Sequence, residues 1–184
     1  MDKLRDLPQF MTNNKFKLSH RYITSIHVDT FILTSHVENL DLSHNWLDVD
    51  CQENYCPLFP IGVLTPLINL KVLNLSNNYL RSILLTDGEV FKGLKHLIKL
   101  NLGYNKLNAI NKNFFRHLSK LITVNLEHNQ FVNLPMDSFS SLQYLYNFDL
   151  SHNKLSQNQI EQFNREAEER AKNIGKFMFL LIPR

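Results

Sequence analysis

The stretch LIKLNLGYNKL at residues 97–107 decides the fold, because close copies of it recur along the chain. The copies that follow are LITVNLEHNQF at 121–131 and LYNFDLSHNKL at 145–155. Those that precede it are LKVLNLSNNYL at 70–80, VENLDLSHNWL at 37–47 and a weaker one, NNKFKLSHRYI, at 13–23. Successive copies start 24, 33, 27, 24 and 24 residues apart. The chain is therefore an array of equivalent units with two insertions.

Each copy alternates between apolar and polar residues, as a short strand with one buried face does. The fourth and sixth residues are expected to point inward, and the third, fifth and seventh outward. One unit alone buries little apolar surface, so neighbouring units must stack to form a core. We expect one short strand per unit, with parallel strands in adjacent units.

Two further columns run through the array. Six residues before each unit stands an apolar residue, which we assign to the core: Phe31, Leu64, Phe91, Phe115, Phe139 and, in the last unit, Phe163. The ninth position of five copies holds an asparagine: Asn45, Asn78, Asn105, Asn129 and Asn153. A buried amide must have its hydrogen bonds made, so each asparagine is expected to bond its own turn and the next coil. Arg21 replaces it in the first copy, which predicts a degenerate cap.

The pattern LxxLxLxxNxL resembles the leucine-rich-repeat family over residues 13–163. Its 24-residue form is similar to the typical class found in Toll-like receptors, small proteoglycans and secreted insect immune proteins. The resemblance implies an α/β solenoid of about six coils, with short parallel strands on the concave face. We assign residues 1–184 to a single domain: 1–36 as N-terminal cap and degenerate repeat, 37–163 as repeats, and 156–184 as C-terminal cap helix and tail.

The C-terminal segment carries a helical pattern in place of another repeat. Apolar residues from Ile160 to Ile174 fall on one helical face, and Ser156 followed by Gln159 resembles a capping box. We expect a helix from about 157 to 173 that covers the last coil. Phe177–Ile182 is either a final edge strand or an exposed stub of a longer protein.

Composition argues against several functional classes. The net charge is +3 with no block of like charge, which indicates no nucleic-acid partner and no anionic-membrane surface. No glycine-rich phosphate loop, cofactor motif or nucleophile–base–acid set is readable, so we expect no enzyme and no cofactor. The longest apolar run has six residues, too few to insert in a membrane, and residues 1–11 lack a signal-peptide core. Localisation stays open, although the resemblance favours an extracellular or cell-surface protein.

Two sets of residues invite a chemical interpretation. Cys51 and Cys56 lie in the longer insertion, where a disulfide and free thiols both remain open. The eighth position holds His20, His44, His128 and His152, and neighbouring coils stack about 5 Å apart. A metal clip or a pH-sensitive pair is one interpretation. Solvent-facing histidines that recur with the repeat are the other, and we predict no metal site.

The outward positions supply candidate partner-binding residues. Aromatic side chains stand at the tenth position of three successive units, Tyr22, Trp46 and Tyr79, with Tyr104 nearby. Exposed aromatics are typical anchors of protein interfaces, although they could instead pack on their own turns. The polar fifth position adds Asp41, Asn74, Asn101, Asn125 and Asp149. The resemblance implies a non-enzymatic recognition module that binds another protein or a microbial ligand on its concave face. The alternative is an intracellular scaffold or regulatory subunit.

Overall fold

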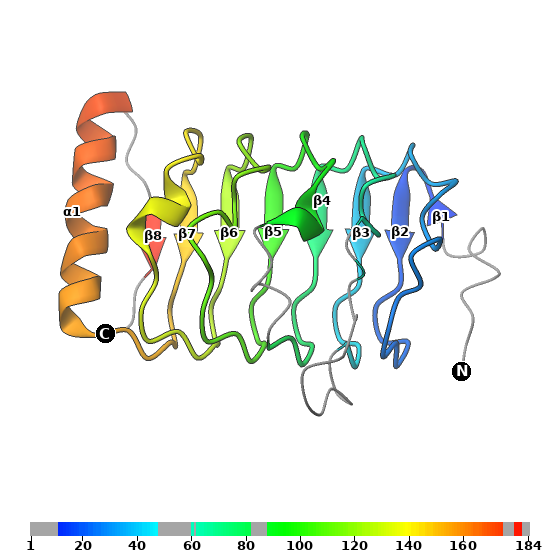
Figure 1. Ribbon diagram of the computed structural model, residues 1–184, viewed down its shortest axis with the longest axis horizontal. Helices are drawn as coiled ribbons and strands as arrows, with labels where there is room; N and C mark the ends of the chain where they lie inside the picture. The colour runs from blue at the N-terminus through cyan, green and yellow to red at the C-terminus, as the bar shows by residue number, and fades with distance from the viewer. Residues whose placement is uncertain (1–10, 48–59, 61, 82–87, 175–178, 182–184) are drawn as a thin grey trace.

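The computed structural model describes residues 11–47, 60, 62–81, 88–174 and 179–181 (Figure 1). Its strands are β1 (Met11–Thr12), β2 (Lys15–Lys17), β3 (Asn39–Asp41), β4 (Val72–Asn74), β5 (Lys99–Asn101), β6 (Thr123–Asn125), β7 (Asn147–Asp149) and β8 (Phe179–Leu181). Two short 3-10 helices, η2 (Glu89–Phe91) and η3 (Met136–Phe139), and one α-helix, α1 (Gln157–Ile174), complete the described elements. Cys51 and Cys56 and most of both insertions lie outside the described residues.

The strands form one sheet in which they follow one another in sequence order, from β1 to β8 (Figure 1). Every pair from β2 onward is parallel, and equivalent positions face each other: Leu73 is paired with Leu40 on one side and Leu100 on the other. The six copies of the pattern each supply one strand, β2 to β7. The predicted stack of parallel strands is thereby confirmed.

The sheet begins with a hairpin that the repeat pattern did not predict. β1 pairs with β2 in the antiparallel direction, Met11 opposite Phe16. Asn13 and Asn14 form the two-residue turn, with φ of 45° and 63°. Asparagine tolerates this left-handed backbone better than most residues, and two such residues in succession favour a tight hairpin turn.

The core follows the predicted columns. The fourth-position residues of all six coils, from Phe16 to Phe148, are at most 2% exposed. The column of larger residues from Phe31 to Phe163 is also buried, at 0–3%. The ring centroids of Phe115 and Phe139 lie 5.4 Å apart and those of Phe139 and Phe163 lie 5.5 Å apart. Helix α1 thus continues the column through Phe163.

The asparagine column forms a ladder of hydrogen bonds, as Asn105 illustrates. Its Nδ2 donates to the carbonyl oxygens of Leu75 and Leu102, both at 3.0 Å, and its Oδ1 accepts the N–H of Leu80 at 3.1 Å. Leu75 and Leu80 belong to the preceding coil. The expectation that the bonds reach the next coil was therefore wrong in direction: each amide connects its own turn to the coil before it.

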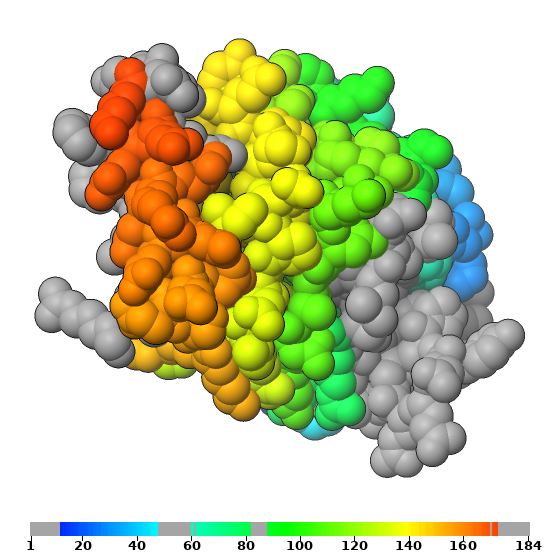
Figure 2. Space-filling view, turned by 60° about the vertical axis from the view of Figure 1, so that its left-hand side comes forward, coloured from blue at the N-terminus to red at the C-terminus, as the bar shows by residue number. Residues whose placement is uncertain are grey.

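The C-terminal helix lies across the end of the solenoid, against the last coil (α1 orange, last coil yellow in Figure 2). Ser156 Oγ accepts the N–H of Gln159 at 3.3 Å, which is half of the expected capping box. Gln159 does not complete it, because its Oε1 accepts the N–H of Leu134 at 2.5 Å instead. Beyond the helix, β8 pairs in parallel with β7, so the interpretation as an edge strand is correct.

Candidate binding surface

The turn that follows each strand has an unusual backbone at its eighth-position residue. This residue has a φ between 48° and 56° in all six coils: His20, His44, Asn77, Tyr104, His128 and His152. Among residues other than glycine, asparagine and histidine are enriched in this left-handed region. Backbone geometry therefore explains why histidine recurs here, which the sequence pattern alone attributed only to repetition.

Hydrogen bonds between coils hold this turn on both sides of the buried asparagine. The N–H of His44 donates to Ser76 O at 3.0 Å, and the N–H of Trp46 donates to Ile23 O at 2.9 Å. The other coils repeat both bonds except at the two ends, where His152 in the last coil and Tyr22 in the first each lack the neighbouring repeat that would supply the acceptor. Because the backbone is fixed, the eighth- and tenth-position side chains project from a rigid frame. They form two rows along the edge of the sheet where the strands end.

The rings of the eighth-position row stack on one another. Centroid separations are 4.3 Å for His20 and His44, 4.3 Å for Tyr104 and His128, and 4.0 Å for His128 and His152, with interplanar angles of 9°, 18° and 12°. Nearly parallel imidazoles direct their nitrogen lone pairs in parallel, so a stacked pair does not converge on one ion. No group of three or more potential metal ligands clusters within the described part of the chain. The stacking gives no support to a metal clip.

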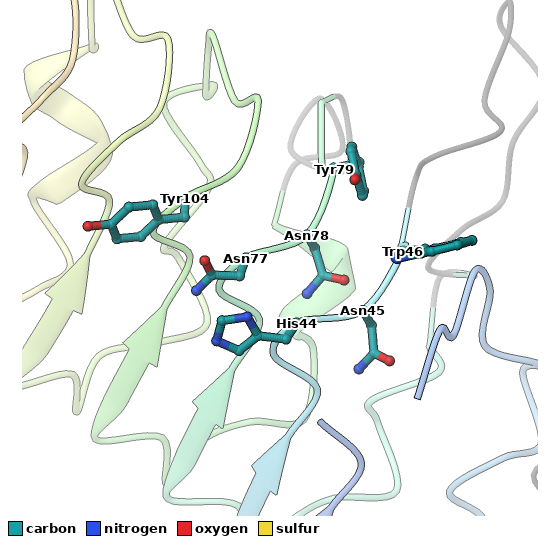
Figure 3. A pocket seen from close by; sticks show the side chains of 7 residues that line it. All are labelled: His44, Asn45, Trp46, Asn77, Asn78, Tyr79 and Tyr104. Atoms are coloured by element: carbon teal, nitrogen blue, oxygen red, sulfur yellow. The ribbon is translucent and has the colours of Figure 1, made fainter. Parts of the chain in front are cut away.

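A shallow hollow, open to solvent, lies between the two rows in the N-terminal half. Figure 3 shows His44, Asn77 and Tyr104 in succession from three neighbouring coils, with Trp46 and Tyr79 beside them. The buried ladder residues Asn45 and Asn78 complete the lining. We name the outer side chains the aromatic surface, defined by Tyr22, His44, Trp46, Asn77, Tyr79 and Tyr104.

The aromatic surface remains accessible although its rings contact one another. Tyr22 and Trp46 pack edge to face at 5.1 Å, and their exposed fractions are 69% and 45%. Tyr104 is 46% exposed, whereas Tyr79 is half-buried, with Lys106 Nζ 4.8 Å above its ring. Contacts with neighbouring turns thus bury part of the surface of these rings. The remaining ring area of Tyr22, Trp46 and Tyr104 is accessible to solvent and therefore to a partner.

The polar fifth-position candidates lie on the strand-lined face and have a structural role. The side-chain oxygen of each accepts the N–H two residues later, at 2.8–3.1 Å, in Asp41, Asn74, Asn101, Asn125 and Asp149. Such Asx turns end a strand by replacing its next ladder bond. Sequence reasoning missed this role, although Asn or Asp directly before the turn was the available signal. These side chains are half-buried and separate from the aromatic surface.

The comparisons with known proteins agree with this architecture. A family model described as "Leucine rich repeat" matches residues 68–131. Residues 68–131 therefore match the leucine-rich-repeat family, and the chain as a whole has the fold of a leucine-rich-repeat solenoid. Among solved structures, the leucine-rich-repeat domain of APL1B is similar, with 22% identity and a TM-score of 0.65 over 78% of this chain and 39% of that one. A comparison with the curated proteins finds no match.

Two further similar structures are complexes. The Toll–Spatzle complex, from Drosophila, shares 24% identity at a TM-score of 0.62 and covers 73% of this chain and 17% of that one. The LRIM1/APL1C complex shares 23% identity at 0.63 and covers 76% and 23%. This repeat chain therefore spans less than half the length of each similar structure. At such identities the likeness establishes the fold alone.

Proposed function

We propose that this chain is a non-enzymatic recognition module that binds another protein through the aromatic surface. The observation that carries the proposal is the set of exposed rings on a backbone that is held by hydrogen bonds between coils. These bonds come from the eighth-position N–H, from the tenth-position N–H and from the side chain of the buried asparagine between them. Preorganised aromatic side chains contribute contact area to an interface at a low entropic cost. The mixed polar groups of His44 and Asn77 would orient the partner.

The hydrogen bonds of the polar residues support a role without catalysis. Ser43 Oγ donates to Asp41 Oδ1 at 2.6 Å, and Ser151 Oγ donates to Asp149 Oδ1 at 2.7 Å. These serines sit at the ends of Asx turns, and the stacked histidines of the eighth position contact other rings. The leucine-rich-repeat fold is in general a protein-interaction module, which agrees with this picture.

We further propose a single domain over residues 1–184 that works outside the cell or at its surface. Support for the location comes from the 24-residue repeat, which resembles the class common in extracellular proteins. Two of the similar structures are protein complexes, one of them described as a molecular hub in Drosophila development and innate immunity. Within the described residues, no helix has both the length and the apolar character needed to cross a membrane. Intact mass under non-reducing conditions tests the location: a Cys51–Cys56 bridge is expected, and free thiols would argue for a reducing compartment.

A comparison of matched variants tests the binding surface. Trp46→Ala with Tyr104→Ala removes two exposed rings of the aromatic surface, and Tyr144→Ala removes a ring that is 64% exposed on the opposite edge. The immobilised wild type and both variants would be presented to proteins secreted by the source cells. Bound proteins would then be quantified by mass spectrometry.

We expect at least one protein to bind the wild type and the Tyr144 variant and to be lost from the double variant. Circular dichroism should be the same for all three, because the changed side chains lie outside the core. Equal retention of every bound protein by the three chains would refute recognition through this surface.

A further inference from the structure

The small net charge of the chain conceals a strong local excess of positive charge. Residues 88–126 contain seven lysines and arginines and one carboxylate, Glu89, which gives +6. The rest of the chain has 13 basic and 16 acidic residues and is therefore −3. A net charge of +3 over the whole chain therefore does not exclude a positively charged surface on these two coils.

The fold gathers four of these cations on neighbouring turns. Lys92 and Lys95 lie on the turn that leads into β5, and Arg116 and Lys120 lie on the turn that leads into β6. Figure 1 shows such turns as a row of projecting loops on the side where the strands begin, opposite the aromatic surface. All four side chains are exposed. Lys120 Nζ lies 3.5 Å from His96 Nδ1 of the preceding coil.

One carboxylate organises this cluster. Glu89 accepts a hydrogen bond from Arg116, lies 3.2 Å from His117 Nε2 and lies 3.5 Å from Lys92 Nζ. These contacts lower the pKa of Glu89 to about 2, first through the hydrogen bond with His117 and then through that with Arg116. Glu89 thus stays ionised and ties the two turns together. Lys95 and Lys120 have no carboxylate partner in the described part of the chain.

We propose that these turns bind a linear sulfated polysaccharide, with Lys92, Lys95, Arg116 and Lys120 contacting its sulfate groups. We name this set the basic edge. Neighbouring coils place cations about one strand spacing apart, roughly 5 Å, so an extended polymer with an anion on each unit can contact both turns at once. Because two of the cations are unpaired, the ligand need not displace an existing ion pair.

The two turns that carry the four cations lack exposed aromatic anchors, which favours this ligand class over others. Within residues 88–97 and 112–121 the aromatic rings are Phe91, Phe114 and Phe115, and all three are 0% exposed. A protein interface uses exposed aromatic anchors, and single-stranded nucleic acid stacks its bases on them. These two turns offer cations and no exposed aromatic ring, and the exposed Tyr144 lies on the next turn along this edge. The two turns therefore suit a ligand that is recognised mainly by its charge.

Heparin serves as the sulfated probe for the test. The double variant Lys95→Gln/Lys120→Gln is compared with Lys15→Gln/Lys154→Gln, which removes the same charge from exposed lysines away from the basic edge. Affinity is measured across a series of NaCl concentrations. The logarithm of the binding constant falls as the logarithm of the salt concentration rises, and each lost cation makes this slope shallower by about 1. We therefore expect the slope of the Lys95→Gln/Lys120→Gln variant to be shallower by about 2 and its affinity to be at least roughly tenfold weaker. The control variant should retain the wild-type slope.

Three further probes distinguish the ligand classes: duplex DNA, poly-glutamate and vesicles containing phosphatidylserine. We expect heparin to bind more tightly than each of them at equal salt. Equal sensitivity of the two double variants would overturn the basic edge as the site. Tighter binding of DNA, poly-glutamate or vesicles than of heparin would overturn the ligand class.

Discussion

Replacement of one central ladder residue, Asn105→Ala, should destabilise the chain by about 3 kcal/mol. The carbonyls of Leu75 and Leu102 would each keep a bond, because Asn78 Nδ2 and Asn129 Nδ2 also donate to them at 3.1 and 3.0 Å. The N–H of Leu80 would lose its partner in a residue that is 0% exposed. An orphaned buried N–H costs about 1–3 kcal/mol, and the lost net bonds add about 1 kcal/mol.

The end of the ladder provides an internal comparison. Asn153 makes the same bonds but is half-buried, so water can replace part of what Asn153→Ala removes. We expect a loss of about 1 kcal/mol there, near the ordinary net value of a hydrogen bond. Asn108→Ala is the control, since this exposed side chain makes no hydrogen bond within the described residues, and it should stay within about 0.5 kcal/mol.

Urea unfolding followed by far-ultraviolet circular dichroism measures all three variants. Fluorescence of Trp46, the single tryptophan, reports separately on an N-terminal coil. Coincident transitions would justify a two-state free energy, which a repeat array does not guarantee. If Asn105→Ala cost no more than Asn153→Ala, the buried N–H would not be the source of the loss, and the reasoning would fail.

Three other predictions concern single positions. The lowered pKa of Glu89 means that its contacts stabilise the fold above pH 4.5 and that this contribution is lost as the pH falls to about 2. Urea unfolding across that range should therefore show wild type and Glu89→Gln converging at the acid end. Gly93→Ala should destabilise more than Gly62→Ala in thermal unfolding: both have positive φ, but a Cβ at Gly93 would lie 2.9 Å from Thr65 O, whereas at Gly62 the nearest atom is 3.7 Å away. In urea unfolding, His128→Val should cost about 1–2 kcal/mol more than His128→Asn, because a branched residue is strained at this φ whereas both variants lose the stacked imidazole. Equal losses for the two His128 variants would contradict the backbone explanation.

The sequence predicted the parts of the fold that depend on period and polarity. Leu100 and Leu102 alternate with polar neighbours, so their inward orientation follows from strand geometry. Phe163 repeats the spacing of Phe139, which was sufficient to place it in the core column. The helix from Gln157 was predictable because its apolar residues share one face.

Other features depend on distances that no local pattern encodes. An amide such as Asn105 has donors and an acceptor on the same side chain, so its type does not reveal which neighbouring coil it contacts. Glu89 and Arg116 are 27 residues apart and meet only because their coils stack. The side chain of Gln159 does not bond the backbone of Ser156, as a complete capping box requires, because its Oε1 accepts the buried N–H of Leu134 instead.

The sequence predicted only part of the candidate site, because a local pattern gives the direction of a side chain but not its contacts with distant residues. Tyr22, Trp46 and Tyr104 were identified from their outward positions, and the structure brings them to one edge. The Asx turns of residues such as Asp41 were missed because alternation predicts the direction of a side chain and not its hydrogen bonds. The basic edge was missed because a net charge sums over residues that the fold separates.

Amide hydrogen exchange of the chain, alone and bound to the protein that it captures, tests the central claim most directly. We predict slower exchange on binding in the turns of the aromatic surface, at residues 44–47, 77–80 and 104–107. The turns of the basic edge, at residues 92–97 and 116–121, should exchange at unchanged rates. Protection confined to those turns or to α1, with none in the turns of the aromatic surface, would contradict the account.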